Sequence, residues 1–388
     1  MTQGMNKPNP IMHHRVHQFV EVAVGDGPHA KRVESLSNAV LGCLTRASLA
    51  IHAIGLGYAE ASGRQGKHGV KQVDRFLSNE GIHVERIADA WVKFVVASRP
   101  NIVVTMDWTD FDDDDQTTIC LNMVTGHGRA TPLLWQTVKK SSLKGQRNAH
   151  EDAILQRLHD ALPEGVRVTI LADRGFGDTK LYAFLKELEF GFIIRFKENI
   201  TVTAKDGASK TAAQWIGNSR RALKLLGATV TGDEFPVGAV VLVRAPDMKD
   251  AWCLVCSDAA MSASVAIAHY GKRFSTEENF RDTKDIRFGM GLSHTRISKP
   301  DRRDRLLLVS ALAVAFLTLL GAAGESTGLD AKFRANTVKR RTHSLFRQGC
   351  MYYDCLPTMR DEWAGPLLEA FEKQLSTHFF AQEVLGTL

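Results

Sequence analysis

The sequence predicts a multidomain α+β protein in which a mixed α/β core lies between helical regions. Three observations lead to this fold class. The 388 residues exceed the usual size of one domain. Apolar residues recur at helical spacing near both ends of the chain. Between them, β-rich runs alternate with helical segments, the pattern of a sheet covered by helices.

Residues 1–95 are expected to form a helical domain. The segments ESLSNAVLGCLTRASLAIHAIG and HVERIADAWVKFVVAS carry apolar residues at helical spacing. A short basic segment lies between them and contains Arg64, Lys67, Lys71 and Arg75. These cations fit a solvated helix face and, equally well, a DNA-binding module of helix-turn-helix type.

Residues 96–200 are expected to form the first part of the core. Three β-rich runs, IVVTMDW, TTICLNMVT and TPLLWQTVK, precede the helix NAHEDAILQRLHDALP. The strand VRVTILADRG, the helix TKLYAFLKELE and the strand FGFIIRFKE follow. This order, β-β-β-α-β-α-β, indicates a mixed sheet with helices on its faces and is that of an RNase H-like core.

Three further regions complete the expected organisation. Residues 201–256 are rich in turns and strands, which indicates a β-rich insertion. Residues 257–325 are the second part of the core, with a helix from about residue 263 to 284. The uncharged run Leu306–Gly324 is long enough to span a membrane. Charges crowd both of its sides, so a buried core helix is favoured and no membrane contact is expected. Residues 326–388 form a basic, helical C-terminal region.

Composition limits the possible functions. The net charge of +6 permits a polyanionic partner. The N-terminal segment lacks the apolar stretch of a secretory signal, and the six cysteines are scattered, as in reduced cytosolic proteins. The chain has no Gly-x4-Gly-Lys-Ser/Thr phosphate loop, so no nucleotide cofactor is expected.

The run NIVVTMDWTDFDDDDQTT holds six aspartates within nine positions. Asp107 ends an apolar strand, whereas Asp112 to Asp115 are expected at a solvated hairpin tip, because like charges repel each other. Asp110 is left unassigned. Asp173 also follows an apolar strand, in VTILADRGF. A right-handed crossover can place the two strands side by side, so that the two carboxylates meet at one end of the sheet.

A third carboxylate comes from the segment HYGKRFSTEENFRDTKD. At 100° per residue, Tyr270, Arg273, Glu277 and Lys284 share a sector of about 60°, and Glu278 points elsewhere. An exposed helix with ion pairs is the alternative. Three rigid carboxylates, Asp107, Asp173 and Glu277, would suit two Mg²⁺ ions in a phosphoryl transfer. The neighbouring Arg273 and Lys284 would bind phosphates.

These residues carry a resemblance to a known family. The signature Tyr-x2-Arg-x3-Glu-x6-Lys is met in full by Tyr270, Arg273, Glu277 and Lys284. The DWTD and LADRGF runs place Asp107 and Asp173 at the first two acids of the family. The chain therefore resembles bacterial cut-and-paste DDE transposases of the insertion-sequence-four family, in the retroviral-integrase superfamily. The resemblance extends from about residue 30 to 350 and is weakest in the insertion.

The resemblance implies an enzyme that cuts and joins DNA. Hydrolysis frees a 3′-OH at the transposon end, the hydroxyl attacks the opposite strand to form a hairpin, the hairpin is opened, and the end is joined to target DNA. Asp107, Asp173 and Glu277 would be catalytic and would bind two Mg²⁺ ions, for which Mn²⁺ can substitute. The partners would be double-stranded DNA and a second copy of the chain, in a bacterial cytoplasm at the nucleoid.

The resemblance also implies DNA contacts outside the acids. Trp252 matches a tryptophan that helps to flip a base during hairpin formation, although a buried strand aromatic is the alternative. Phe274 can stack, but its role stays open. The C-terminal region holds six cations and one acid, Asp330, within twenty residues, which favours phosphate contacts over solvated charge. These cations are Lys332, Arg334, Lys339, Arg340, Arg341 and Arg347.

Two other functions remain possible on this sequence. A structure-selective nuclease with an RNase H-like core would need the same acids but no strand transfer. An inactive transposase-derived protein that only binds DNA is the other, and the intact acids weigh against it.

Overall fold

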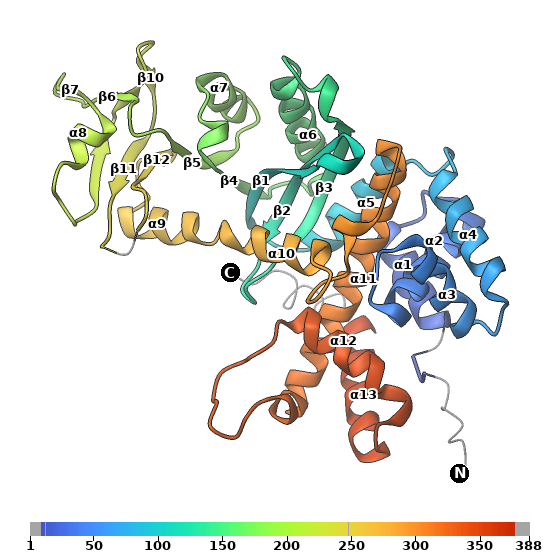
Figure 1. Cartoon of the computed structure of the whole chain (residues 1–388). Coiled ribbons are helices and arrows are strands. Elements are labelled where there is room, and N and C mark those ends of the chain that lie inside the picture. The colour runs from blue at the N-terminus through green and yellow to red at the C-terminus, as the bar shows by residue number, and fades with distance from the viewer. Residues whose placement is uncertain (1–8, 12, 247, 377–388) are drawn as a thin grey trace.

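The computed structural model describes residues 9–11, 13–246 and 248–376. The ends of the predicted N-terminal and C-terminal regions and one residue of the insertion lie outside these ranges. Figure 1 shows a central sheet with helices on both faces, a helical N-terminal region on one side and a helical C-terminal region beneath it. The α+β fold class is confirmed.

The N-terminal region consists of helices that pack closely through glycines. The helices are α1 (His13–Val24), α2 (Ala30–Arg46), α3 (Ile51–Ala61), α4 (Gly66–Ser78) and α5 (Val84–Val96). A Cβ atom at Gly69 would lie 2.1 Å from the carbonyl oxygen of Gly55, and one at Gly42 would lie 2.1 Å from that of Ile54. Only glycine allows this approach of α2, α3 and α4.

The core has the predicted element order. It runs through β1 (Asn101–Phe111), β2 (Gln116–Val124), β3 (Ala130–Lys139), α6 (Arg147–Ala161), β4 (Arg167–Ala172), α7 (Thr179–Glu187) and β5 (Gly191–Phe196). The strands lie in the order β3-β2-β1-β4-β5. β2 pairs antiparallel to β1 and β3, whereas β4 is parallel to β1 and β5. This is the mixed sheet of an RNase H-like fold.

The predicted insertion contributes to two sheets. Its elements are β6 (Thr201–Thr203), β7 (Ser209–Thr211), α8 (Ala212–Ile216), β8 (Leu223–Leu226), β9 (Thr229–Val230), β10 (Phe235–Pro236), β11 (Ala239–Val243) and β12 (Trp252–Cys256). β12, β11 and β8 extend the core sheet beyond β5, and the remaining strands form a separate sheet in the order β10-β9-β6-β7. The core sheet therefore has eight strands.

Helices follow the last strand. They are α9 (Ala263–Gly271), α10 (Phe274–Lys284), α11 (Pro300–Ser326), α12 (Leu345–Cys355) and α13 (Asp361–Ser376). The single helix predicted from about residue 263 to 284 is wrong in one respect, since Lys272 and Arg273 form a turn between α9 and α10. The backbone stays close to helical there, so the side chains keep nearly the expected directions.

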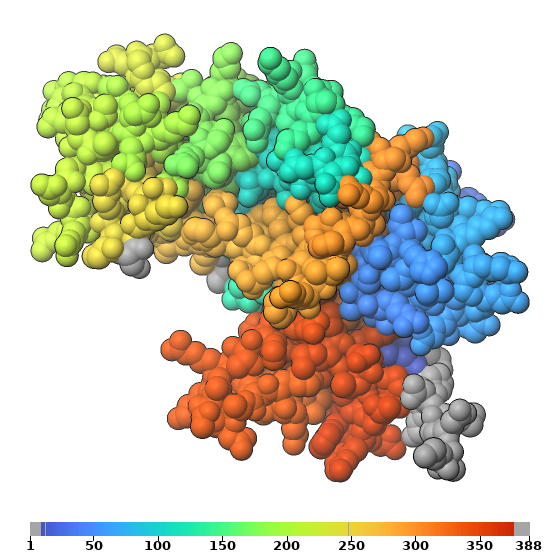
Figure 2. All heavy atoms as spheres, viewed as in Figure 1, coloured from blue at the N-terminus to red at the C-terminus, as the bar shows by residue number. Residues whose placement is uncertain are grey.

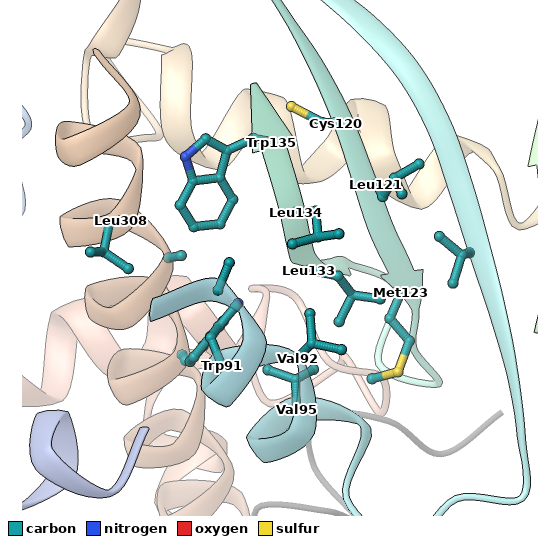
Figure 3. Packing of buried hydrophobic residues seen from close by; sticks show 14 of the residues in the cluster. Trp91, Val92, Val95, Cys120, Leu121, Met123, Leu133, Leu134, Trp135 and Leu308 are labelled. Atoms are coloured by element: carbon teal, nitrogen blue, oxygen red, sulfur yellow. The ribbon is translucent and has the colours of Figure 1, made fainter. Parts of the chain in front are cut away.

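Helix α11 is the buried core helix that the sequence predicts. It is long and apolar enough to cross a membrane, but 83% of its most apolar window is buried inside the protein. It packs against α2, α12, α13 and β3. Figure 3 shows side chains of α5, β2, β3 and α11 meeting in this core. The indole Nε1 of Trp91 donates to the carbonyl oxygen of Pro132, and that of Trp135 donates to the carbonyl oxygen of Asp304.

The aspartate run between β1 and β2 is not a uniformly solvated tip. Asp112 and Asp113 are exposed, as expected, with side-chain exposures of 75% and 71%. Asp114 is only 11% exposed and pairs with the fully buried Arg303 of α11. The expectation of a solvated side chain is therefore wrong for Asp114, because the run folds back onto the core.

Candidate active site

Asp107 and Asp173 meet where two parallel strands separate. The paired register of β1 and β4 ends at Met106 and Ala172, and the two aspartates are the next residues of their chains. The side chain of Asp173 accepts a hydrogen bond from the backbone N–H of Gly175 at 2.7 Å, which fixes the turn after β4. β1 itself continues to Phe111 along β2, so the expectation that Asp107 ends its strand is wrong. β4 ends there instead, which opens the sheet beside Asp107.

Arg273 joins Asp107 to Glu277. Its Nη2 donates to Glu277 Oε1 at 2.8 Å, and its Nη1 lies 3.5 Å from Asp107 Oδ2. The Arg273 side chain is only 11% exposed, whereas that of Glu277 is 52% exposed, so water reaches this ion pair from the glutamate side. Glu278 points elsewhere, as the helical spacing predicts, and pairs with Arg129 and Arg281. The structure thus places Asp107 and Glu277 on one arginine, and Asp173 lies at the end of the strand beside Asp107.

The carboxyl group of Asp107 is electrostatically unusual. Its pKa is raised from 3.8 to about 6, chiefly by burial and to a smaller extent by the charges of Asp173 and Glu277. The guanidinium of Arg273 and the backbone N–H of Trp108 act in the opposite direction. Three acids that influence one another in this way need a cation for all of them to be ionised together.

The acids suit a hard cation by their chemistry. Mg²⁺ prefers oxygen ligands such as carboxylates. The three carboxylates here come from a strand, a turn at a strand end and a helix. Among the described residues, no three His, Cys, Asp or Glu side chains are close enough together to enclose a metal ion. The positive charge beside Asp107 and Glu277 comes from Arg273, which forms ion pairs with both carboxylates. A metal ion would have to bind oxygens of these same carboxylates.

Aromatic side chains border the acids. Trp252, the first residue of β12, packs edge-on against Tyr270, with ring centroids 4.9 Å apart. Its ring also lies 6.4 Å from that of Phe274 in a tilted arrangement. Tyr270 is 2% exposed, whereas Phe274 is 47% exposed. The half-buried Trp252 therefore lies between a core tyrosine and a solvent-facing phenylalanine.

Lys284 is tied to β1. Its Nζ donates to Thr109 Oγ1 and to the carbonyl oxygen of Asp110, each at 2.9 Å. The same ammonium group lies 4.3 Å from the ring centroid of Phe111. Burial lowers the pKa of Lys284. The signature lysine thus fastens the end of α10 to the strand that carries Asp107.

A second cluster of side chains lies beside the acids and was not predicted from the sequence. The indole Nε1 of Trp108 donates to Glu151 Oε1 at 2.8 Å, and Arg147 approaches the same oxygen at 3.3 Å. The guanidinium of Arg147 lies 5.3 Å from the Trp108 ring centroid and 6.0 Å from that of Phe176. These contacts join α6 to the residues that follow Asp107 and Asp173. No motif signals them, because Trp108 and Glu151 are far apart in sequence.

The other predicted DNA-contacting cations lie in two separate regions of the chain. Lys67, Lys71 and Arg75 are exposed on α4, and Arg64 precedes this helix. In the C-terminal region Lys339, Arg340 and Arg341 are exposed, and Arg341 also pairs with Glu325 at 2.8 Å. Figure 2 shows a hollow between this C-terminal region and the α9–α10 segment.

One comparison with known proteins bears on this site. Residues 132–316 match the family model described as Transposase DDE domain. The matched segment contains Asp173 and Glu277, and Asp107 precedes it. No curated protein matches the chain. The match and the RNase H-like sheet together support a DDE transposase, an enzyme whose substrate is DNA.

Proposed function

We propose that this protein is a cut-and-paste DNA transposase of the insertion-sequence-four type. The observation that carries the proposal is the meeting of Asp107 and Asp173 on parallel neighbouring strands, with Glu277 joined to Asp107 through Arg273. The family match supports the general reaction class. The specific sequence of nicking, hairpin formation, hairpin opening and strand transfer is our inference from the signature of Tyr270, Arg273, Glu277 and Lys284.

The residues of the site would divide the work of phosphoryl transfer. Asp107, Asp173 and Glu277 would hold two Mg²⁺ ions, which when bound would activate the attacking hydroxyl and stabilise the leaving oxygen. Arg273 keeps the acids balanced in charge and lies where a phosphate oxygen could replace a carboxylate as its partner. Trp252 offers an aromatic face to a displaced base.

Binding of DNA ends is assigned to surfaces outside the acids. The exposed cations of α4 lie on a short helix that follows α3 after a brief turn, as in helix-turn-helix domains. We propose that this helix contacts the transposon end, together with Lys339, Arg340 and Arg341 of the C-terminal region. A homodimer would hold two ends together.

The test is cleavage of a duplex that carries the inverted repeat flanking the gene. The full chain with Mg²⁺ should release nicked and then hairpin product, and a duplex with a scrambled repeat should be cut far less. Cleavage without hairpins and without end preference would indicate a structure-selective nuclease. Binding without any cleavage in Mg²⁺ or Mn²⁺ would indicate a protein that only binds DNA.

A further inference from the structure

Two buried threonines connect the strand of Asp107 to the helix of Glu277. Thr105 lies two residues before Asp107 in β1, and Thr276 immediately precedes Glu277 in α10. Their Oγ1 atoms are 2.5 Å apart, and both residues have 0% exposure. Thr105 Oγ1 also lies 3.2 Å from the carbonyl oxygen of Asn122, to which it donates. Since a hydroxyl carries one proton, Thr276 is then the donor to Thr105.

Helix α10 has little apolar surface with which to fix its position. Its sequence, FSTEENFRDTK, contains two large apolar residues, and one of them, Phe274, is 47% exposed. The buried residues of the helix are polar, namely Ser275, Thr276, Asn279, Asp282 and Thr283. Apolar contacts are not directional, whereas hydrogen bonds fix distance and angle. The position of α10 on the sheet therefore depends on specific polar contacts.

The threonine pair lies close in sequence to both acids. Thr105 and Asp107 lie on the same face of β1, because alternate residues of a strand share a face. A shift of α10 at Thr276 would move Glu277 with it, since the two residues are adjacent in one helix. Mg²⁺ accepts oxygen ligands only within a narrow range of about 2.0–2.1 Å.

We infer that Thr105 and Thr276 form a positioning pair that sets the separation of the Asp107 and Glu277 carboxylates. The inference rests on the proposed function, in which these acids hold metal ions. Neither threonine touches substrate or metal. Each acts through the acid beside it, and the expected effect is on metal affinity rather than on DNA binding.

The same sheet contains a matched control pair. Thr118 of β2 and Thr137 of β3 also place their Oγ1 atoms in contact, at 2.8 Å, and both are buried. Neither residue adjoins a candidate catalytic acid. Replacing Thr by Val removes the hydroxyl and keeps the shape, whereas Ser keeps the hydroxyl. Thr276→Val, Thr276→Ser and Thr118→Val therefore separate the effect of position from the general cost of losing a buried hydrogen bond.

The experiment measures Mn²⁺ affinity of the full chain by calorimetry and the Mg²⁺ concentration that gives half-maximal DNA cleavage. Thr276→Val should weaken both by about tenfold or more, the range found when groups that orient metal ligands are removed. Thr276→Ser and Thr118→Val should each keep both values within about threefold of wild type. The tenfold effect expected for Thr276→Val corresponds to about 1.4 kcal/mol. End binding without metal should be equal in all variants.

The outcomes distinguish this inference from the proposed function. If the wild-type chain binds Mn²⁺ and cleaves DNA, but Thr276→Val behaves like Thr118→Val, the positioning role alone is overturned. A weakened Thr276→Val that serine does not rescue would also overturn it, because the hydroxyl would then not be the cause. A wild-type chain that neither binds Mn²⁺ nor cleaves DNA would overturn the proposed function, and this inference with it.

Discussion

Arg303, which is fully buried in α11, donates from its Nη2 to Asp114 Oδ2 at 2.5 Å. Its Nε donates to Gln116 Oε1 at 2.7 Å, and its guanidinium lies 3.8 Å from the ring centroid of Phe111. Asp114 also accepts from the backbone N–H of Ile297. The ion pair thus joins the core helix to the segment that follows the strand of Asp107. Asp114 of the acidic run therefore has a structural role.

Removal of Asp114 should destabilise the protein. Asp114→Ala leaves the Arg303 guanidinium buried without its counter-ion, and breaking such a pair costs about 3–5 kcal/mol. Asp113→Ala is the matched control, because Asp113 pairs with Arg296 at the exposed surface, where a salt bridge contributes about 0–1 kcal/mol. Urea denaturation of both variants measures the difference. Equal free energies of unfolding would show that Arg303 does not depend on Asp114.

The three acids should be individually necessary for cleavage. Asp107→Asn, Asp173→Asn and Glu277→Gln each remove a proposed metal ligand and should abolish cleavage while end binding persists. The triple variant should be no worse than a single one, because parts of one catalytic unit are not additive. Glu278→Gln is the control, since Glu278 pairs with Arg129 away from the site. Gel assays measure both activities, and cleavage above about a hundredth of the wild-type rate in one variant would exclude that residue.

The element order of the core and the placement of Asp173 beside Asp107 could be predicted because both depend on local patterns, whereas the catalytic role of the acids stays a prediction. The strand and helix order follows from apolar periodicity, and the right-handed crossover then places Asp173 beside Asp107. The spacing of Tyr270, Arg273 and Glu277 likewise predicts which side chains face together, because the turn between α9 and α10 keeps a nearly helical backbone.

Contacts between distant segments were not predictable in the same way. Arg303 lies in the charged run DRRDR, which in the sequence indicates only the charged end of an apolar helix. Its partner Asp114 is 189 positions away. Likewise, the joining of β12 to β5 depends on how the insertion folds back. The contact of Thr105 with Thr276 has no sequence signal, because threonine in a strand is explained by β propensity alone.

The metal-free protein should lose stability as pH rises through the titration range of Asp107. Burial raises its folded pKa from 3.8 to about 6, so the folded state holds a proton that the unfolded state releases above pH 4. The free energy of unfolding should fall by at most about 2–3 kcal/mol between about pH 4 and 6, since one pKa unit corresponds to about 1.4 kcal/mol. Above about pH 6 it should stay level.

Asp107→Asn should lack this fall. Thermal unfolding in EDTA across pH 4 to 8 measures it, with the exposed Asp113→Asn as control. At pH 7 the Asp107→Asn protein should therefore unfold at a higher temperature than wild type, although it binds no metal. Parallel pH profiles for wild type and Asp107→Asn would contradict the electrostatic account of the site.

Trp252→Ala should separate the first nick from hairpin formation. The nick hydrolyses an accessible phosphodiester and needs no displaced base, whereas a hairpin turns the strand back tightly at the DNA end. Extruding a base relieves that turn at a cost of a few kcal/mol, and stacking on an aromatic face recovers about 1–3 kcal/mol. Loss of Trp252 should slow hairpin formation by about one to two powers of ten, so that nicked DNA accumulates.

Two further variants test whether stacking is the cause. Trp252→Phe should recover part of the hairpin rate, because it restores an aromatic face beside Phe274. Trp215→Ala is the control, since Trp215 is a half-buried tryptophan of the insertion whose Nε1 donates to the carbonyl oxygen of Val202. A time course on denaturing gels resolves nicked from hairpin product. If Trp252→Ala slows both steps equally, as a core substitution would through its contact with Tyr270, Trp252 has no role in base displacement.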